Sequence, residues 1–299
     1  MNTTETPFVR LTDNNIEQLE PFFQLYAFGI CDNTIGAVFQ WRDIYESYFK
    51  IIGRCLCIRA GYGSYGDCYT VPIGCSDFAC SFAAIEKDAE QNGIPLRFCV
   101  VPEEALPLLE KQYGDRMHAE SIRDWADYLY DADAFRTYAG KTLHTQKNHV
   151  NRFYRDNPDA QCVLIQDSET EQKVYAFLDE YAEQHLESSE LERNELNGAR
   201  ELLANRDRLG QVAAGLLCEG KIVALSIGEV KNRTLYVHVE KARTDISGAY
   251  PAMAQAFVRL FPEIDTVNRE DDGGDAGLRY SKLQYKPKKL LEKYLVKID

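Results

Sequence analysis

The sequence lacks the signals that would assign it to a membrane, a secretory route or a nucleic-acid surface. No apolar run in its 299 residues approaches the roughly 18 that a membrane-spanning helix needs. The segment Met1 to Thr6 has neither the basic nor the apolar part of a signal peptide. A net charge of −13 repels polyanions, so a nucleic-acid partner would need a strong local basic patch. We therefore expect a soluble, cytoplasmic protein with no membrane partner.

The nine cysteines lack both the spacing of a zinc site and the even number of a disulfide framework. Cys55 and Cys57 are separated by one residue, whereas zinc-binding pairs usually have two to four between them. Cys68, Cys75 and Cys80 have no histidine nearby. We expect buried, reduced thiols and no metal.

A linker rich in Pro, Gly or Ser is also absent, although the chain is long enough for two domains. Helical and strand patterns alternate through both halves, which predicts an α/β fold of the α+β type with mixed sheets. A last strand is predicted over residues 290–298. We place a weak boundary near Ala132 and so expect domains over residues 1–132 and 133–299, in a monomer or weak dimer.

The order of elements after residue 205 is distinctive. Three predicted strands, over residues 212–218, 222–230 and 234–241, have short connections and form an antiparallel meander. A loop with Gly248 then precedes a helix predicted over residues 252–261. The loop residues that would offer backbone N–H groups to an anion such as a pyrophosphate are Ile246, Ser247, Gly248, Ala249 and Tyr250. Plain turn formation is the alternative.

A second candidate segment is basic. Residues 141–155 predict a helix with two Lys, two Arg and no acidic residue. His144, Asn148 and Arg152 lie four residues apart, with Lys147 on the neighbouring stripe. This stripe is either a solvated surface or a substrate site for a phosphate, a carboxylate or an RNA backbone. Arg152 is the best single anion ligand, because a guanidinium binds oxyanions with two N–H groups.

The strand predicted over residues 234–241 carries candidates for acid–base chemistry. Side chains alternate between faces, so Tyr236, His238 and Glu240 are predicted to share one face. His238 and Glu240 are therefore candidates for the general base that N-acyl transfer needs. The alternative is that these residues form a half-exposed polar face with no catalytic role.

The most polar segment lies near the end of the sequence. Three consecutive acids, Glu270 to Asp272, run into Gly273 and Gly274, and Arg279 and Lys282 follow. The acids either hold a cationic amine substrate or pair with these two cations. The substrate-binding candidates of this segment are Asn268, Glu270, Asp271, Arg279 and Lys282.

Taken in order, several segments resemble one group of transferases. These segments are Asp127 to Asp131, Gly140 to Phe153, Glu240 to Ala242, Gly248 to Tyr250, Asn268 to Asp271 and Gly277 to Leu283. Together they resemble an uncharacterised bacterial family grouped with the C-terminal catalytic domain of phosphatidylglycerol lysyltransferases and, more distantly, with Fem-type peptidyltransferases. The resemblance spans the chain from about Trp41 to the end. It implies two GNAT-like (N-acetyltransferase-like) domains in tandem and transfer of an acyl or aminoacyl group.

The resemblance also implies a cofactor. In the GNAT fold, a loop and helix at this place hold the pyrophosphate of acyl-coenzyme A. That implies acyl-CoA bound by Arg243 and the loop over residues 246–250, although Arg243 lies five residues before Gly248, which departs from the spacing of the family. Tyr280 resembles the tyrosine that protonates the leaving thiolate in many GNAT enzymes; packing is the alternative.

Three classes of function are open. Acyl-CoA-dependent transfer to a small amine acceptor fits the loop and the acidic composition. Aminoacyl transfer from a charged tRNA to a lipid or peptide fits the basic helix and the resemblance, but the net charge disfavours tRNA binding. A non-catalytic binding module with this fold is the third class.

Overall fold

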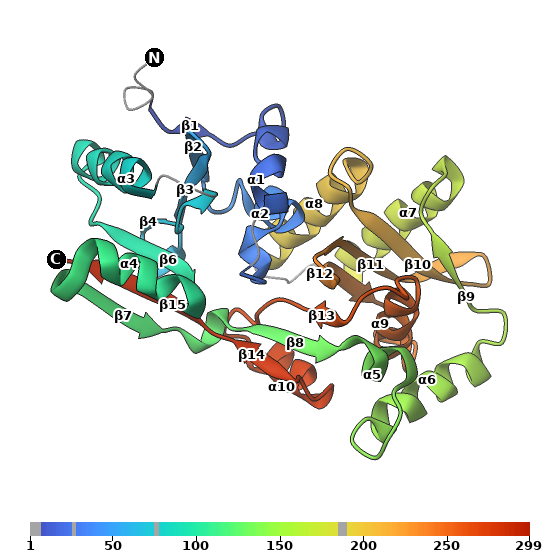
Figure 1. Ribbon diagram of the computed structural model, residues 1–299. Helices are drawn as coiled ribbons and strands as arrows, with labels where there is room; N and C mark the ends of the chain where they lie inside the picture. Colours follow the sequence, from blue (N-terminus) through green and yellow to red (C-terminus); the bar gives the residue numbers. More distant parts are fainter. Residues whose placement is uncertain (1–6, 26–27, 75–77, 185–189) are drawn as a thin grey trace. The chain divides into compact units, whose positions relative to one another are not determined.

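The computed structural model describes residues 7–25, 28–74, 78–184 and 190–299. Met1 to Thr6 and Cys75, on which two expectations rest, lie outside these residues. The chain forms two compact units, one of residues 1–127 and 291–299 and the other of residues 128–290 (Figure 1). Each unit contains its own mixed sheet, so the predicted fold class is confirmed. None of the helices in the described part of the chain is long and apolar enough to cross a bilayer.

The first unit is built on a sheet with the strand order β1-β2-β3-β4-β6-β15-β7, and β5 pairs with β3. Its strands are β1 (Val9–Arg10), β2 (Tyr48–Ile52), β3 (Cys55–Gly61), β4 (Asp67–Tyr69), β5 (Ile73–Gly74), β6 (Arg97–Pro102), β7 (Met117–Ser121) and β15 (Lys293–Ile298). Its α-helices are α1 (Glu20–Leu25), α2 (Ile35–Trp41), α3 (Phe78–Asn92) and α4 (Leu106–Tyr113). Helix α3 buries Phe82 and Ile85 in a core with Phe98 of β6, which fixes it on the sheet.

The second unit is built on a sheet with the strand order β14-β8-β13-β12-β11-β10-β9. Its strands are β8 (Asp127–Asp131), β9 (Gln161–Leu164), β10 (Val212–Cys218), β11 (Lys221–Lys231), β12 (Thr234–Ala242), β13 (Thr266–Asn268) and β14 (Lys289–Leu291). Its helices are α5 (Ala132–Thr137), α6 (His144–Asp156), α7 (Ser168–Gln184), α8 (Glu190–Ala204), α9 (Ala249–Arg259) and α10 (Ala276–Gln284). The antiparallel meander β10-β11-β12 is confirmed, and β12 pairs in parallel with β13.

Helices cover both faces of this second sheet (Figure 1). Helix α9 is almost entirely buried, and it packs against β11, β12, α5 and α6. Helices α7 and α8 pack against β11. Small residues such as Ala252, Ala254 and Ala256 let α9 lie close to the sheet, so its N-terminus is held in a fixed place.

The division into units differs from the predicted split at residue 132. The first crossing lies inside β8, because Leu129 to Asp131 pair with β13 of the second unit. The predicted strand over residues 290–298 is two strands: β14 belongs to the second sheet, whereas β15 pairs with β6 and β7 of the first. The chain therefore passes between the units twice.

The cysteines also differ from expectation. Cys68 of β4 and Cys99 of β6 form a disulfide, so the expectation of reduced thiols is wrong for this pair. The reason is tertiary: β4 and β6 pair in parallel through Tyr69 and Phe98, which places the two sulfurs side by side. Among the other cysteines that the structure describes, Cys31, Cys55, Cys57 and Cys218 are buried thiols, Cys162 is half-buried and Cys80 is exposed.

Candidate functional site

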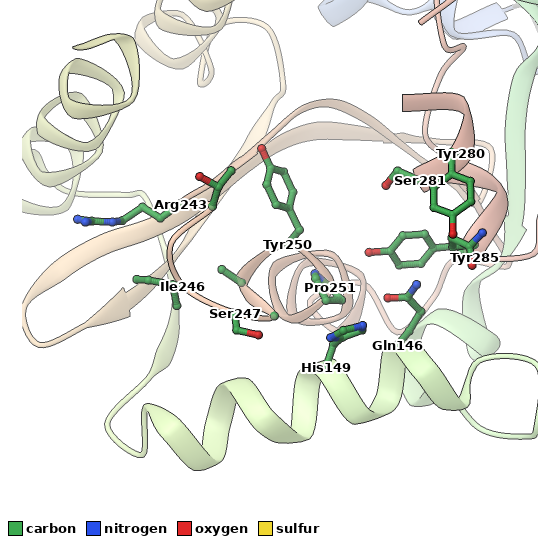
Figure 2. A pocket seen from close by; sticks show the side chains of 14 residues that line it. Gln146, His149, Arg243, Ile246, Ser247, Tyr250, Pro251, Tyr280, Ser281 and Tyr285 are labelled. Carbon is green, nitrogen blue, oxygen red and sulfur yellow. The ribbon is translucent and has the colours of Figure 1, made fainter. Parts of the chain in front are cut away.

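A cavity of about 430 Å³ lies in the second unit, where α9 begins (Figure 2). Three segments form its wall: the loop before α9, one face of α6, and α10 with the residue after it. The lining residues are Gln146, His149, Arg243, Thr244, Ile246, Ser247, Gly248, Ala249, Tyr250, Pro251, Tyr280, Ser281, Gln284 and Tyr285. The structure therefore brings all six predicted cofactor-binding residues and Tyr280 to one cavity.

The loop takes its shape from Gly248. This residue is the N-cap of α9 and has a φ of 84°, a conformation that favours glycine. A Cβ here would clash with the backbone carbonyl oxygen of His149 and would press on Phe153. Because Gly248 has no Cβ, α6 can pack directly against the start of α9.

Arg243 lies at the cavity with its charge already matched. Its guanidinium donates to Asp245 through Nε at 3.1 Å and Nη2 at 2.9 Å, and to Glu180 through Nη1 at 3.2 Å. The bonds to Asp245 hold the pKa of that carboxyl below its usual value. A phosphate here would have to compete with two carboxylates for the same donors.

Helix α6 presents two different polar faces. The predicted stripe of His144, Lys147, Asn148 and Arg152 is exposed and does not line the cavity. Arg152 Nε lies 3.4 Å from the carboxylate of Asp156, at the helix end. The cavity wall instead takes Gln146 and His149, which the prediction did not include. They lie at the border between the exposed stripe and the buried side of α6, a position that sequence periodicity marks only weakly.

A bulge in β12 changes the faces of the predicted acid–base residues. Glu240 pairs with Ser226, but Val237 pairs with Gly228, so β12 has one residue more than β11 over this stretch. Since one extra residue reverses the alternation, Glu240 shares a face with Val237 and not with Tyr236. The predicted common face of Tyr236, His238 and Glu240 is therefore wrong.

His238 is buried between two carboxylates. Its Nδ1 lies 2.7 Å from Oε1 of Glu270, and its Nε2 lies 3.0 Å from Oε1 of Glu229. Burial alone lowers the pKa of His238, but the bonds to both glutamates outweigh it and raise the pKa to about 9. At neutral pH this imidazole is the positive member of an ion triad.

Glu240 is bound to Arg269, which follows β13. Arg269 Nη2 donates to Glu240 Oε1 at 2.6 Å, and the side chains are 10% and 11% exposed. The guanidinium also lies 4.6 Å from the ring centroid of Tyr285. Burial raises the pKa of Tyr285 to about 12 despite the nearby Arg269 charge. His238 and Glu240 are both engaged in ion pairs, and their role as a base stays a prediction.

The acidic segment is largely paired within itself. Asp272 accepts from Arg279 Nε at 2.9 Å, from Arg279 Nη2 at 2.6 Å and from the Tyr128 hydroxyl at 2.5 Å. Burial raises the pKa of Asp272, but these bonds outweigh it and lower the pKa to about 2. Lys282 is buried, and its ammonium donates to the backbone carbonyls of Arg269 and Asp271. These bonds hold the segment over residues 269–272 against α10.

The remaining candidates of this segment have other surroundings. Asn268 is buried, and its side-chain oxygen accepts from the backbone N–H of Glu270 at 2.7 Å. Asp271 accepts from the backbone N–H of Gly273 at 3.1 Å. Tyr280 is 69% exposed and lines the cavity beside Ser281. The substrate-binding roles in this segment stay predictions.

A second buried charge cluster lies in the first unit. Lys293 Nζ lies 2.5 Å from Asp32, 2.6 Å from Asp127 and 3.3 Å from the Cys31 sulfur. Cys31, Asp32 and Asp127 have the ligand types of a cation site. The Lys293 ammonium supplies the positive charge among them, which favours a structural ion cluster.

Comparisons with known proteins agree with this architecture. The family model for the phosphatidylglycerol lysyltransferase C-terminal region matches residues 23–297. A Bacteroides thetaiotaomicron protein of unknown function is 29% identical, with a TM-score of 0.89 over 98% of this chain and 99% of that one. L-PGS from Bacillus licheniformis is 18% identical, with a TM-score of 0.66 over 97% of this chain and 93% of that one, which shows a common fold.

One curated relative is more limited in extent. An uncharacterised protein from Mycoplasmoides gallisepticum is 27% identical over 177 residues, which is 58% of this chain and 56% of that protein. The chain thus spans about half the length of this relative. The family match over residues 23–297 decides the assignment: the chain belongs to the phosphatidylglycerol lysyltransferase C-terminal family.

Proposed function

We propose that the protein is an acyltransferase that moves an acyl or aminoacyl group from a phosphate-bearing donor to an amine. The observation that carries this proposal is the cavity at the start of α9. It joins the loop residues expected to hold a donor with Tyr280, the residue expected to protonate the leaving group. Its volume of about 430 Å³ is within the range of small-molecule sites.

The cavity has the chemistry that donor binding needs. The positive end of the α9 dipole attracts a phosphate, although the Ala249 N–H already donates to the Ile246 carbonyl and Pro251 has no N–H. Ile246, Tyr250 and Pro251 give an apolar wall for the chain of the donor. In the reaction, the amine nitrogen bonds to the donor carbonyl carbon and loses its surplus proton to a base. The bond from that carbon to the leaving sulfur or oxygen breaks, and Tyr280 gives the leaving atom a proton.

Acyl-CoA is the first candidate donor. It is small enough for a loop of this kind, and the net charge of −13 does not oppose it as strongly as it opposes a long polyanion. An aminoacyl-tRNA is the second candidate, because α6 contributes both to the cavity wall and to the exposed basic stripe with Lys147 and Arg152. A tRNA backbone on that stripe would place its acylated end near the cavity.

Thermal unfolding with each donor tests the proposal. A donor at about 100 times its Kd stabilises the folded state by about 2.7 kcal/mol. If acyl-CoA is the donor, acetyl-CoA raises Tm by several degrees, while pantetheine, which lacks phosphates, has a smaller effect. The effect should survive in the Lys147→Ala/Arg152→Ala variant.

The second donor gives a different pattern. If aminoacyl-tRNA is the donor, lysyl-tRNA binds with an affinity that falls steeply with salt, and the same double variant reduces both the affinity and the salt slope. The proposed function is wrong if neither acetyl-CoA nor lysyl-tRNA changes Tm and neither donor loses its acyl group to an amine.

A further inference from the structure

Helix α6 places two polar side chains on the cavity wall that no donor contact explains. Gln146 and His149 are three residues apart, so they lie on the same face of the helix. Figure 2 shows both side chains extending from α6 toward the start of α9, Gln146 on the side of Tyr285 and His149 below Pro251. They come from a different element than the phosphate-attracting loop.

Gln146 is the more unusual of the two. The residue is only 8% exposed, and its amide makes no hydrogen bond to any residue that the structure describes. Buried polar side chains nearly always have a partner, because an unsatisfied amide costs free energy. The amide atoms of Gln146 are not fully enclosed by protein, so they open onto the cavity, where a ligand can be their partner.

His149 differs from the other histidine of this region. His238 is held between Glu229 and Glu270, whereas the His149 imidazole has neither a hydrogen bond nor an ion pair within the described part of the chain. It reaches the cavity from an exposed position, so it is in contact with water. Histidine is the side chain that most often serves as a general base.

The other groups that could take a proton are engaged. Glu240 is bound to Arg269 at 2.6 Å, and Asp245 and Glu180 are bound to Arg243. Tyr280, Ser281 and Gln284 complete the polar wall, but a tyrosine or serine hydroxyl is a poor base at neutral pH. Of the residues lining the cavity, His149 is the one suited to accept a proton.

We propose that Gln146 and His149 form the acceptor site of this transferase, for a primary amine, with Gln146 as the positioning residue and His149 as the general base. This rests on the proposed function. The amine nitrogen forms its bond to the donor carbonyl carbon, and its surplus proton goes to His149 Nε2 or Nδ1. The bond to the leaving atom breaks with its electron pair, and Tyr280 returns a proton to that atom.

Kinetics of two variants and a matched control test this assignment. The assay uses acetyl-CoA or lysyl-tRNA as donor, with n-butylamine and L-lysine as acceptors. His149→Gln should lower kcat by roughly 10²–10⁴-fold and remove the acidic limb of the pH profile, while the Tm shift caused by the donor stays. Gln146→Met should raise KM for the amine and leave the Tm shift caused by the donor in place, because it removes only the amide proposed to hold the acceptor. His118→Gln, in the first unit, should change neither.

A chemical footprint gives a readout that does not need turnover. Diethyl pyrocarbonate should modify His149 more slowly when acetyl-CoA or lysyl-tRNA is bound, while His118 reacts at an unchanged rate. If a donor raises Tm but His149→Gln keeps the wild-type kcat and pH profile, and the footprint is unchanged, the acceptor site is wrong and the proposed function stands. If no donor raises Tm or is consumed, the proposed function has failed, and the acceptor site fails with it.

Discussion

The cavity at the start of α9 and the charged cluster around the ends of β12 and β13 are both polar, but they differ in how far their polar groups are paired. In the cluster, His238 faces two glutamates, Glu240 faces Arg269, and Asp272 faces Arg279. In the cavity, Gln146 and His149 have no protein partner among the described residues. The cluster holds β12, β13 and α10 together, whereas these two cavity residues face the opening.

This difference shows why charge density in a sequence is an uncertain guide to a site. A buried charge is stable only when it is paired, so the charges of a dense charged segment often form ion pairs with one another. Perturbed pKa values mark both kinds of region, since burial raises the pKa of Tyr285 on the cavity wall and hydrogen bonds to two glutamates raise the pKa of His238 in the cluster. The useful distinction is whether a polar group that faces a cavity is already satisfied.

The largest expected effect comes from breaking the cluster at Arg269. Arg269→Met leaves the Glu240 carboxylate buried without its cation, which costs about 3–5 kcal/mol. Urea denaturation measures the loss, and Arg269→Met/Glu240→Leu should recover much of it because the unpaired charge is gone. A loss below about 1 kcal/mol in the single variant would mean that this ion pair does not hold β12 to β13.

A pH series sharpens the contrast at His238. The usual histidine pKa is about 6.5, and the folded protein raises the pKa of His238 to about 9. The stabilisation is therefore fully present below pH 6.5 and is lost as pH rises through about 9, with a magnitude on the order of 3 kcal/mol. The difference in unfolding free energy between wild type and His238→Gln should shrink from pH 6 to pH 9.5. A difference that stays constant with pH would contradict the charged triad.

A smaller effect tests the link between α6 and the cavity. Gly248 and Gly140 have similar φ angles, 84° and 87°, but a Cβ at Gly140 meets open space. In both alanine variants the left-handed conformation lowers the free energy of unfolding by about 1–2 kcal/mol. Gly248→Ala should cost about a further 1–3 kcal/mol from the clash with α6. Thermal unfolding of both variants measures the excess, and equal losses would mean that α6 does not pack against Gly248.

Local patterns made much of the second unit predictable. The meander and the helix over residues 144–156 follow from periodicity and turn residues, and the prediction placed each within a few positions. The bulge at His238 was not predictable, because it is visible only in the pairing of β12 with β11. The same holds for residues 290–298, whose apolar pattern is continuous although the chain changes sheets between Leu291 and Lys293.

The sequence by itself determined the class of fold, the order of elements, the family and the segments that gather at the cavity, because these depend on local propensity and on motif spacing. Only the tertiary structure decided which polar groups are paired with one another. Arg243, Glu240 and His238 are matched by residues that lie far from them in the sequence, such as Glu180, Arg269 and Glu270. Gln146 and His149 reach the cavity wall from α6, which packs against Gly248. Pairing depends on distances in space, and a sequence contains those distances only through its fold.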